Sequence, residues 1–92
     1  MNTTESELQM PLIHSNGNSG TALGNQYFEA LRGLQDFEHK LYAVEFHRRD
    51  YYPLGDEAWN VAVEQRNEIK KKISDIRYYL EAHSVHCFNS AR

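Results

Sequence analysis

Two long stretches of this chain carry apolar residues at spacings that alternate between three and four. In residues 22–48 these positions are Leu23, Tyr27, Ala30, Leu34, Phe37, Leu41 and Val44. In residues 57–84 the equivalent stripe is Trp59, Ala62, Arg66, Ile69, Ile73, Ile76, Leu80 and His83. Such spacing keeps every member of a stripe on one side of an α-helix. The sequence therefore predicts two amphipathic helices, at about 22–48 and 57–84.

The segment between the two stripes cannot continue a helix. Pro53 disfavours helical geometry at Tyr52, and Gly55 relaxes the turn that follows. Asp56 is a suitable N-cap for the second helix, because its carboxylate can accept a free N–H of the first turn. Folding the chain back at this break pairs stripe positions whose numbers sum to 106 or 107, from Arg48/Trp59 to Leu23/His83. The prediction is an all-α protein built as one long antiparallel hairpin.

The regions outside the hairpin have no helical period. Residues 1–21 are polar and form an expected N-terminal arm and cap turn, in which Met10 to Ile13 is a short apolar segment suited to a strand or to an arm on a partner. Ser19 or Thr21 is the expected N-cap of the first helix. Residues 85–92 are expected to be a C-terminal tail.

A lone hairpin would leave a second apolar stripe exposed on the first helix. Its members are Phe28, Leu31, Tyr42 and Phe46. Contiguous apolar surface of this kind usually marks an interface. We therefore expect two copies to form a four-helix-bundle dimer, or a higher oligomer made of such dimers.

Composition and charge exclude several classes of protein. The net charge is −3 and the sequence pI is about 5.9, which argues against general DNA or RNA binding. No apolar run approaches the roughly 18 residues that cross a bilayer, so no membrane association is expected. The N-terminus is polar and does not resemble a signal peptide. Cys87 is the only cysteine, which fits a reducing compartment. We expect a cytoplasmic protein.

The loop between the helices is the first candidate ligand site. It contains Arg48, Arg49, Asp50, Tyr51 and Tyr52. Guanidinium groups grip phosphate through paired hydrogen bonds, and phenol rings offer a surface on which a base can stack. Asp50 could orient an arginine or accept a ribose hydroxyl. The alternative is a cationic helix end followed by a turn filled with aromatic rings.

The turn before the first helix is the second candidate. His14, Asn16, Asn18 and Ser19 lie beside the free N–H groups of a helix N-terminus, which favour an anion. The alternative is a simple cap with a flexible arm. The turn and the loop belong to opposite ends of one hairpin, so they could share a pocket only in an antiparallel dimer, where the turn of one chain meets the loop of the other.

Other reactive residue types form no recognisable catalytic or metal site. His83, His86 and Cys87 share one helical turn, but zinc normally takes four ligands in fixed geometry and no matching motif is present. Arg66 is expected to pair with Glu38 or Glu45 and fix the helix register. Lys70, Lys71 and Lys72 are expected to form a solvated face. The sequence thus predicts neither an enzyme nor a resident cofactor.

The two turns carry a family resemblance. Residues 13–19 read Ile-His-Ser-Asn-Gly-Asn-Ser, and residues 49–55 read Arg-Asp-Tyr-Tyr-Pro-Leu-Gly. This combination resembles a group of short bacteriophage and prophage proteins without an established activity. The resemblance covers most of residues 12–84 and implies a phage-linked origin. In style the chain is also similar to viral sponge proteins, which are small oligomers that hold cyclic nucleotides through arginine and aromatic residues.

These patterns lead to one functional hypothesis and one alternative. The hypothesis is an oligomeric phage-linked protein that captures a cyclic or linear nucleotide at an inter-subunit pocket and so sequesters a host immune signal in the host cytoplasm. The alternative is an interaction module that masks a host protein through its acidic and aromatic surface. A concave pocket favours the first, and a flat exposed aromatic patch favours the second.

Overall fold

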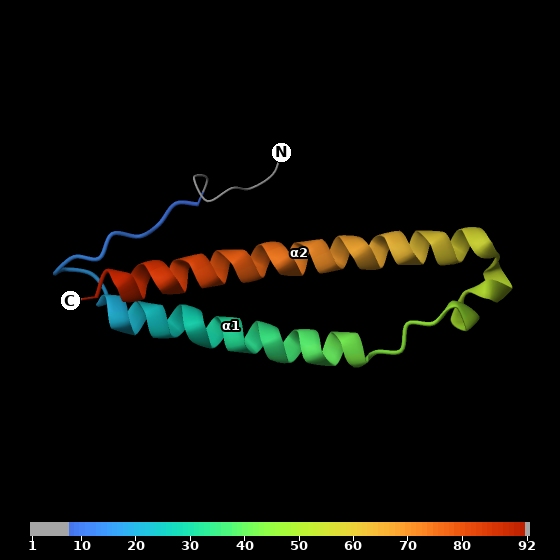
Figure 1. Cartoon of the computed structure of the whole chain (residues 1–92), viewed down its shortest axis with the longest axis horizontal. Coiled ribbons are helices and arrows are strands. Elements are labelled where there is room, and N and C mark those ends of the chain that lie inside the picture. The colour runs from blue at the N-terminus through green and yellow to red at the C-terminus, as the bar shows by residue number, and fades with distance from the viewer. Residues whose placement is uncertain (1–7, 92) are drawn as a thin grey trace.

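The computed structural model describes residues 8–91, and the elements in that range form an antiparallel helical hairpin. Helix α1 spans Gly20–Ala43 and helix α2 spans Asp56–Asn89. Two short 3₁₀ turns, η2 (Arg48–Asp50) and η3 (Tyr52–Leu54), lie between them. Figure 1 shows the helices side by side, with the connection at one end and both the start of α1 and the end of α2 at the other. The expected all-α hairpin is confirmed.

Helix α1 begins as its sequence predicts. The Ala22 N–H donates to the Ser19 hydroxyl at 3.0 Å, while the Leu23 N–H donates to the Ser19 carbonyl at the same distance. Ser19 has extended backbone geometry, with φ of −67° and ψ of 153°. These features make Ser19 the N-cap, because its side chain satisfies a donor that the first turn leaves free.

The end of α1 corrects the sequence prediction. The helix stops at Ala43 rather than near residue 48, and Val44 has extended geometry. The chain then runs without helix until η2, so Arg48 is not on the α1 stripe. The physical reason lies in Phe46, whose ring stacks on Trp59 with centroids 4.8 Å apart. This contact half-buries the Phe46 ring, and removing apolar area from water favours the extended path of the chain over a further helical turn.

Helix α2 is longer than expected and begins differently. Its N-cap is Gly55, at φ 103°, and no side chain caps the first turn. Asp56 is already helical, and its carboxylate accepts from Arg48 at 2.9 Å instead of capping the helix. The helix continues past residue 84 to Asn89, so most of the expected tail is helical. Cys87 lies in this added part and is fully buried.

Two glycines explain why α2 extends so far. A Cβ on Gly20 would lie 2.5 Å from the Cys87 carbonyl oxygen, and a Cβ on Gly24 would lie 3.0 Å from the Phe88 ring. The Ser84 hydroxyl donates to the Gly24 carbonyl at 3.3 Å. The last turns of α2 therefore pack directly against the α1 backbone, and this close packing offsets the low helix propensity of glycine.

This glycine contact turns both helices away from the predicted layers. The predicted series on α1 includes Leu23, Ala30 and Phe37. In the structure, the residues one position later are buried or half-buried: Gly24, Leu31 and Glu38. Across the seam, Glu38 forms an ion pair with Arg77 of α2. The hydrogen bond to Glu38 raises the pKa of the Arg77 guanidinium.

The predicted Phe37/Ile69 layer is therefore wrong. The exposed fractions are 51% for Phe37, 44% for Ile69 and 48% for Ile76. Among the described residues, the buried apolar side chains are Leu31, Ile73 and Cys87. Leu31 therefore belongs to the core and not to the exposed second stripe that the sequence predicted. The hairpin thus encloses a narrow core and leaves Phe37, Ile69 and Ile76 partly exposed.

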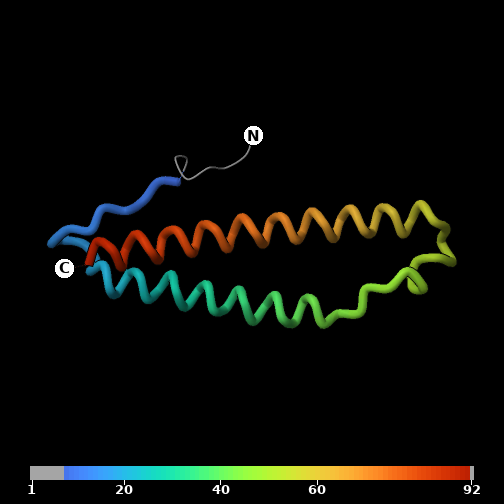
Figure 2. Tube along the Cα trace, in the orientation of Figure 1, coloured from blue at the N-terminus to red at the C-terminus, as the bar shows by residue number. Residues whose placement is uncertain are grey.

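The described part of the N-terminal arm folds back along α2, as Figure 2 shows in blue. The His86 Nε2–H donates to the Pro11 carbonyl at 2.8 Å, which fixes the arm beside the last turns of the helix. Met10 lies with Tyr78 and Val85 around a shallow hollow. Residues 10–13 form no strand, and they lie against α2 of the same chain.

Candidate functional site

The arginines of the connecting loop are both engaged with neighbouring carboxylates. Arg48 Nη2 lies 2.9 Å from Asp56 Oδ1, and Arg49 Nη2 lies 3.1 Å from Glu45 Oε1. All four side chains are exposed, so each ion pair contributes little to stability. A phosphate could replace either carboxylate only by competing with it.

The aromatic residues of the loop divide into two roles. Tyr51 packs in a cluster with Phe46 and Trp59, at centroid distances of 5.8 and 5.6 Å. Tyr52 is 62% exposed, and Asp50 is also exposed. The Asp50 N–H donates to the His47 carbonyl, and the Arg49 N–H donates to His47 Nδ1, so that His47 caps η2. Tyr51 therefore packs within the turn, as the aromatic part of the alternative interpretation predicted. The cationic helix end of that alternative is wrong, because α1 stops at Ala43 and the two arginines lie in η2.

The turn before α1 is held by its own backbone. The Gly17 N–H donates to the His14 carbonyl at 3.1 Å, and the Asn16 N–H donates to His14 Nδ1 at 3.3 Å. Asn18 is exposed, and Ser19 caps the helix. A shallow hollow lies where His14 and Ser19 meet the end of α2.

The turn and the loop occupy opposite ends of an elongated molecule of 61 × 28 × 16 Å. Figure 1 shows the turn beside the C-terminal end of α2 and the loop at the far end. One chain therefore cannot bring the two candidate segments into a single site, as the sequence predicted. A composite pocket between two chains stays a hypothesis.

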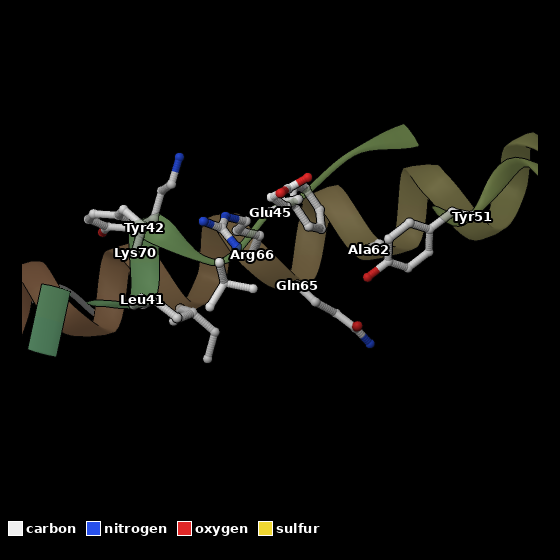
Figure 3. A pocket seen from close by; sticks show the side chains of 11 residues that line it. Leu41, Tyr42, Glu45, Tyr51, Ala62, Gln65, Arg66 and Lys70 are labelled. Atoms are coloured by element: carbon white, nitrogen blue, oxygen red, sulfur yellow. The ribbon is translucent and has the colours of Figure 1, made fainter. Parts of the chain in front are cut away.

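A different concavity lies between the end of α1 and the start of α2. The groove has a volume of about 310 Å³ and lies between Tyr42 and Phe46 on one chain segment and Arg66 and Lys70 of α2. Figure 3 shows Tyr42, Lys70 and Arg66 close together, with Tyr51 farther along the groove. Its size is at the lower end of the range typical of small-molecule sites.

The cations of this groove rest on aromatic rings. The Arg66 guanidinium carbon lies 4.7 Å from the Phe46 ring centroid and 5.8 Å from that of Tyr42, while Lys70 Nζ lies 5.8 Å from the Tyr42 centroid. Within residues 8–91, no salt bridge involves either cation. The expected pairing of Arg66 with Glu38 or Glu45 is therefore wrong, because these carboxylates bind Arg77 and Arg49.

The groove lining carries two positive charges and one carboxylate, that of Glu45. Glu45 already neutralises Arg49, so the charge that faces the groove is that of Arg66 and Lys70. A groove with free cations beside aromatic rings suits a ligand that combines an anionic group with a flat ring. This local positive charge stands against a net charge of −3 for the whole protein.

The sequence alone does not reveal this groove, because its residues belong to separate patterns. Lys70 lies in a run predicted to be solvated, and Tyr42 and Phe46 lie in the predicted second stripe. A detectable signal was present: Tyr42 and Phe46 are four residues apart, and so are Arg66 and Lys70. Each pair therefore lies on one side of its segment if both are helical. What the spacing could not show is that the two pairs face each other.

The histidines near the C-terminus have structural partners. His83 is 1% exposed, and its Nδ1–H donates to the Tyr79 carbonyl at 2.9 Å. The centroid of its ring lies 4.0 Å from the Tyr79 ring centroid and 4.9 Å from that of Tyr27. Burial raises the pKa of the Cys87 thiol and, together with the neighbouring Tyr79, that of Tyr27. No cluster of three or more metal-binding side chains occurs in the part of the chain that the structure describes. A raised thiol pKa disfavours the nucleophilic thiolate.

Comparison of the chain with protein-family models, with curated proteins and with solved structures gave no match. Between residues 8 and 91, neither helix is both long and apolar enough to cross a bilayer.

Proposed function

We propose that this protein captures a phosphorylated, nucleotide-like ligand in the groove between Tyr42 and Lys70. The observation that carries the proposal is the pair of cations, Arg66 and Lys70, which have no acidic partner among the described residues and lie over aromatic rings. In this arrangement the cations bind phosphate oxygens while the rings of Tyr42 and Tyr51 contact the base. In a phage-encoded protein, such capture would sequester a host signalling nucleotide in the host cytoplasm.

The inter-subunit version of the site extends the same chemistry. In an antiparallel dimer, His14, Asn16, Asn18 and Ser19 of one chain approach the loop of the other. Arg48 or Arg49 then exchanges its carboxylate for the ligand phosphate. This version requires that the exposed ion pairs open, which costs little.

Isothermal titration calorimetry with AMP, cyclic AMP, cyclic di-AMP and inorganic phosphate tests the proposal. Arg66→Gln and Lys70→Gln each remove a charge-assisted hydrogen bond, which is worth about 1.5–3 kcal/mol, or roughly 10–100-fold in affinity. Lys71→Gln is the matched control, because Lys71 is exposed and lies outside the groove lining. Binding that depends on Arg49 instead would place the ligand at the loop.

Two results would sink the groove proposal. One is the absence of heat with every compound of the panel. The other is an equal loss of affinity in Lys70→Gln and Lys71→Gln, which would reflect general charge attraction rather than a built site. Far-UV circular dichroism of each variant checks that the hairpin remains folded.

The second candidate function is an interaction module that masks a host protein. The observation in its favour is the number of exposed apolar side chains, of which Leu54, Tyr52 and Val44 at the loop end are 76%, 62% and 59% exposed. Capture of a host protein that is lost in Leu54→Ser and Tyr52→Ser, without any nucleotide binding, would support this alternative.

A further inference from the structure

The two cations of the groove converge on one end of it. Arg66 and Lys70 are four residues apart on α2, so they lie on the same side of the helix. The Arg66 guanidinium carbon and Lys70 Nζ each lie 5.8 Å from the Tyr42 ring centroid. Figure 3 shows both side chains close to Tyr42, with Tyr51 farther along the groove. The positive charge is therefore gathered in one place rather than spread along the groove.

The two cations differ in how firmly they are held. Arg66 is half-buried, and its guanidinium carbon also lies 4.7 Å from the Phe46 ring centroid, so two rings hold it. Lys70 is exposed and lies over the Tyr42 ring. An arginine held in this way presents paired N–H donors in a fixed direction, while a lysine on its flexible stem adjusts to a further oxygen. A ligand group with three terminal oxygens can use both cations.

A terminal phosphate monoester has these properties. It carries three acceptor oxygens and a charge of about −1.5 to −2 at pH 7. This charge matches the two positive charges of Arg66 and Lys70, which form no salt bridge in the part of the chain that the structure describes. A phosphodiester, as in a cyclic nucleotide, has a single negative charge and two free oxygens, so it would leave part of the positive charge uncompensated.

The rest of the groove disfavours a second phosphate. Its volume of about 310 Å³ is at the lower end of the range for small-molecule sites. Besides the two cations, the charged side chain among the lining residues is that of Glu45, whose carboxylate offers no donor to a phosphate. Arg49 lies outside the lining and is paired with Glu45. The groove therefore suits one nucleotide unit rather than a cyclic dinucleotide.

We infer that the groove holds a linear nucleotide by a terminal phosphate monoester, with the phosphate between Arg66 and Lys70. This inference rests on the proposed function and narrows its ligand class: nucleoside monophosphates bind, and cyclic nucleotides are the weaker ligands. The base then extends along the groove toward Tyr51. These contacts come from a single chain.

Isothermal titration calorimetry with AMP and its methyl ester, a phosphodiester, tests this inference. The methyl group removes one charge and one free oxygen from the phosphate and leaves the base and ribose unchanged. The wild type is expected to bind AMP about tenfold or more tightly than the methyl ester or cyclic AMP, because a charge-assisted hydrogen bond is lost. Ribose 5-phosphate has the same phosphate without a base and is expected to bind more weakly than AMP.

Two variants locate the preference for the monoester. Lys70→Gln is expected to reduce the preference for AMP over its methyl ester to within about threefold, because the cation that binds the further oxygen is gone. Lys71→Gln is the matched control: Lys71 carries the same charge one position away, is exposed and lies outside the lining. Its preference is expected to equal that of the wild type. Circular dichroism checks that both variants keep the helical hairpin.

Several results would overturn the inference and leave the proposed function in place. They are equal affinity of the wild type for AMP and its methyl ester, tighter binding of cyclic di-AMP than of AMP, and a preference for AMP that Lys70→Gln leaves intact. Ribose 5-phosphate that binds as tightly as AMP would overturn the assignment to a nucleotide. The absence of heat with every compound would remove this inference together with the proposed function.

Discussion

Substituting Gly20 with alanine tests the close approach of the helices at the open end of the hairpin. The new Cβ would lie 2.5 Å from the Cys87 carbonyl oxygen and 3.0 Å from the Ala91 nitrogen. Both atoms belong to the backbone, so no side-chain rotation relieves the contact, and the helices must separate. Overpacking of this kind costs about 1–3 kcal/mol.

Gly33→Ala is the matched control on the same helix. A Cβ at Gly33 meets no atom within 4 Å, so alanine is expected to stabilise α1 by about 0.5–1 kcal/mol through helix propensity. In a domain of this size, 1 kcal/mol shifts Tm by roughly 4–8 °C. Gly20→Ala is therefore expected to lower Tm by roughly 4–24 °C, while Gly33→Ala raises it by a few degrees.

Thermal unfolding followed by far-UV circular dichroism measures both changes. All variants are compared at one protein concentration, because the proposed self-association would make Tm depend on concentration. A rise in Tm for Gly20→Ala equal to that for Gly33→Ala would refute the reasoning, since it would mean that α2 does not pack against the Gly20 backbone.

Four further outcomes are expected. Ser19→Ala removes the side-chain cap of α1 and is expected to lower the free energy of unfolding by about 1 kcal/mol in urea denaturation. Arg77→Ala leaves the Glu38 carboxylate, whose side chain is 15% exposed, without its partner. We expect the free energy of unfolding to fall by about 1–3 kcal/mol. A double-mutant cycle with Glu38→Gln measures the coupling energy between the two side chains. Burial and the neighbouring Tyr79 raise the pKa of Tyr27 above its ordinary value of 10.0, so the folded state holds this proton more tightly than the unfolded state. The contribution of this proton to the free energy of unfolding is fully present below pH 10 and is lost as the pH rises above 10. Tyr27→Phe is expected to remove that fall from a plot of unfolding free energy against pH. Because burial raises the pKa of Cys87 and leaves it 0% exposed, its reaction with Ellman's reagent at pH 8 is expected only in denaturant, and rapid reaction of the native protein would contradict the burial.

At the loop end of the hairpin, the sequence and the structure point to different basic and aromatic residues. The sequence predicts a ligand site at Arg48, Arg49 and Tyr51. The structure pairs both arginines with carboxylates and packs Tyr51 against Trp59. The groove depends on Arg66, whose surroundings are set by the early end of α1 and the return of Phe46 over α2.

The sequence by itself determined that the chain forms two helices joined by a turn, since these features are local. A period of three and four, a capping Ser19, and the Pro53 and Gly55 break act through the nearest turns of the backbone. The rotation of each helix about its own axis was decided only by the tertiary structure. Apolar spacing favours Leu23, Ala30 and Phe37 over Gly24, Leu31 and Glu38. The structure nevertheless buries or half-buries the second set, because Gly20 and Gly24 let the end of α2 approach the α1 backbone. That choice leaves Phe37 on the surface, because close packing between residues far apart in the chain outweighs the burial of one more ring.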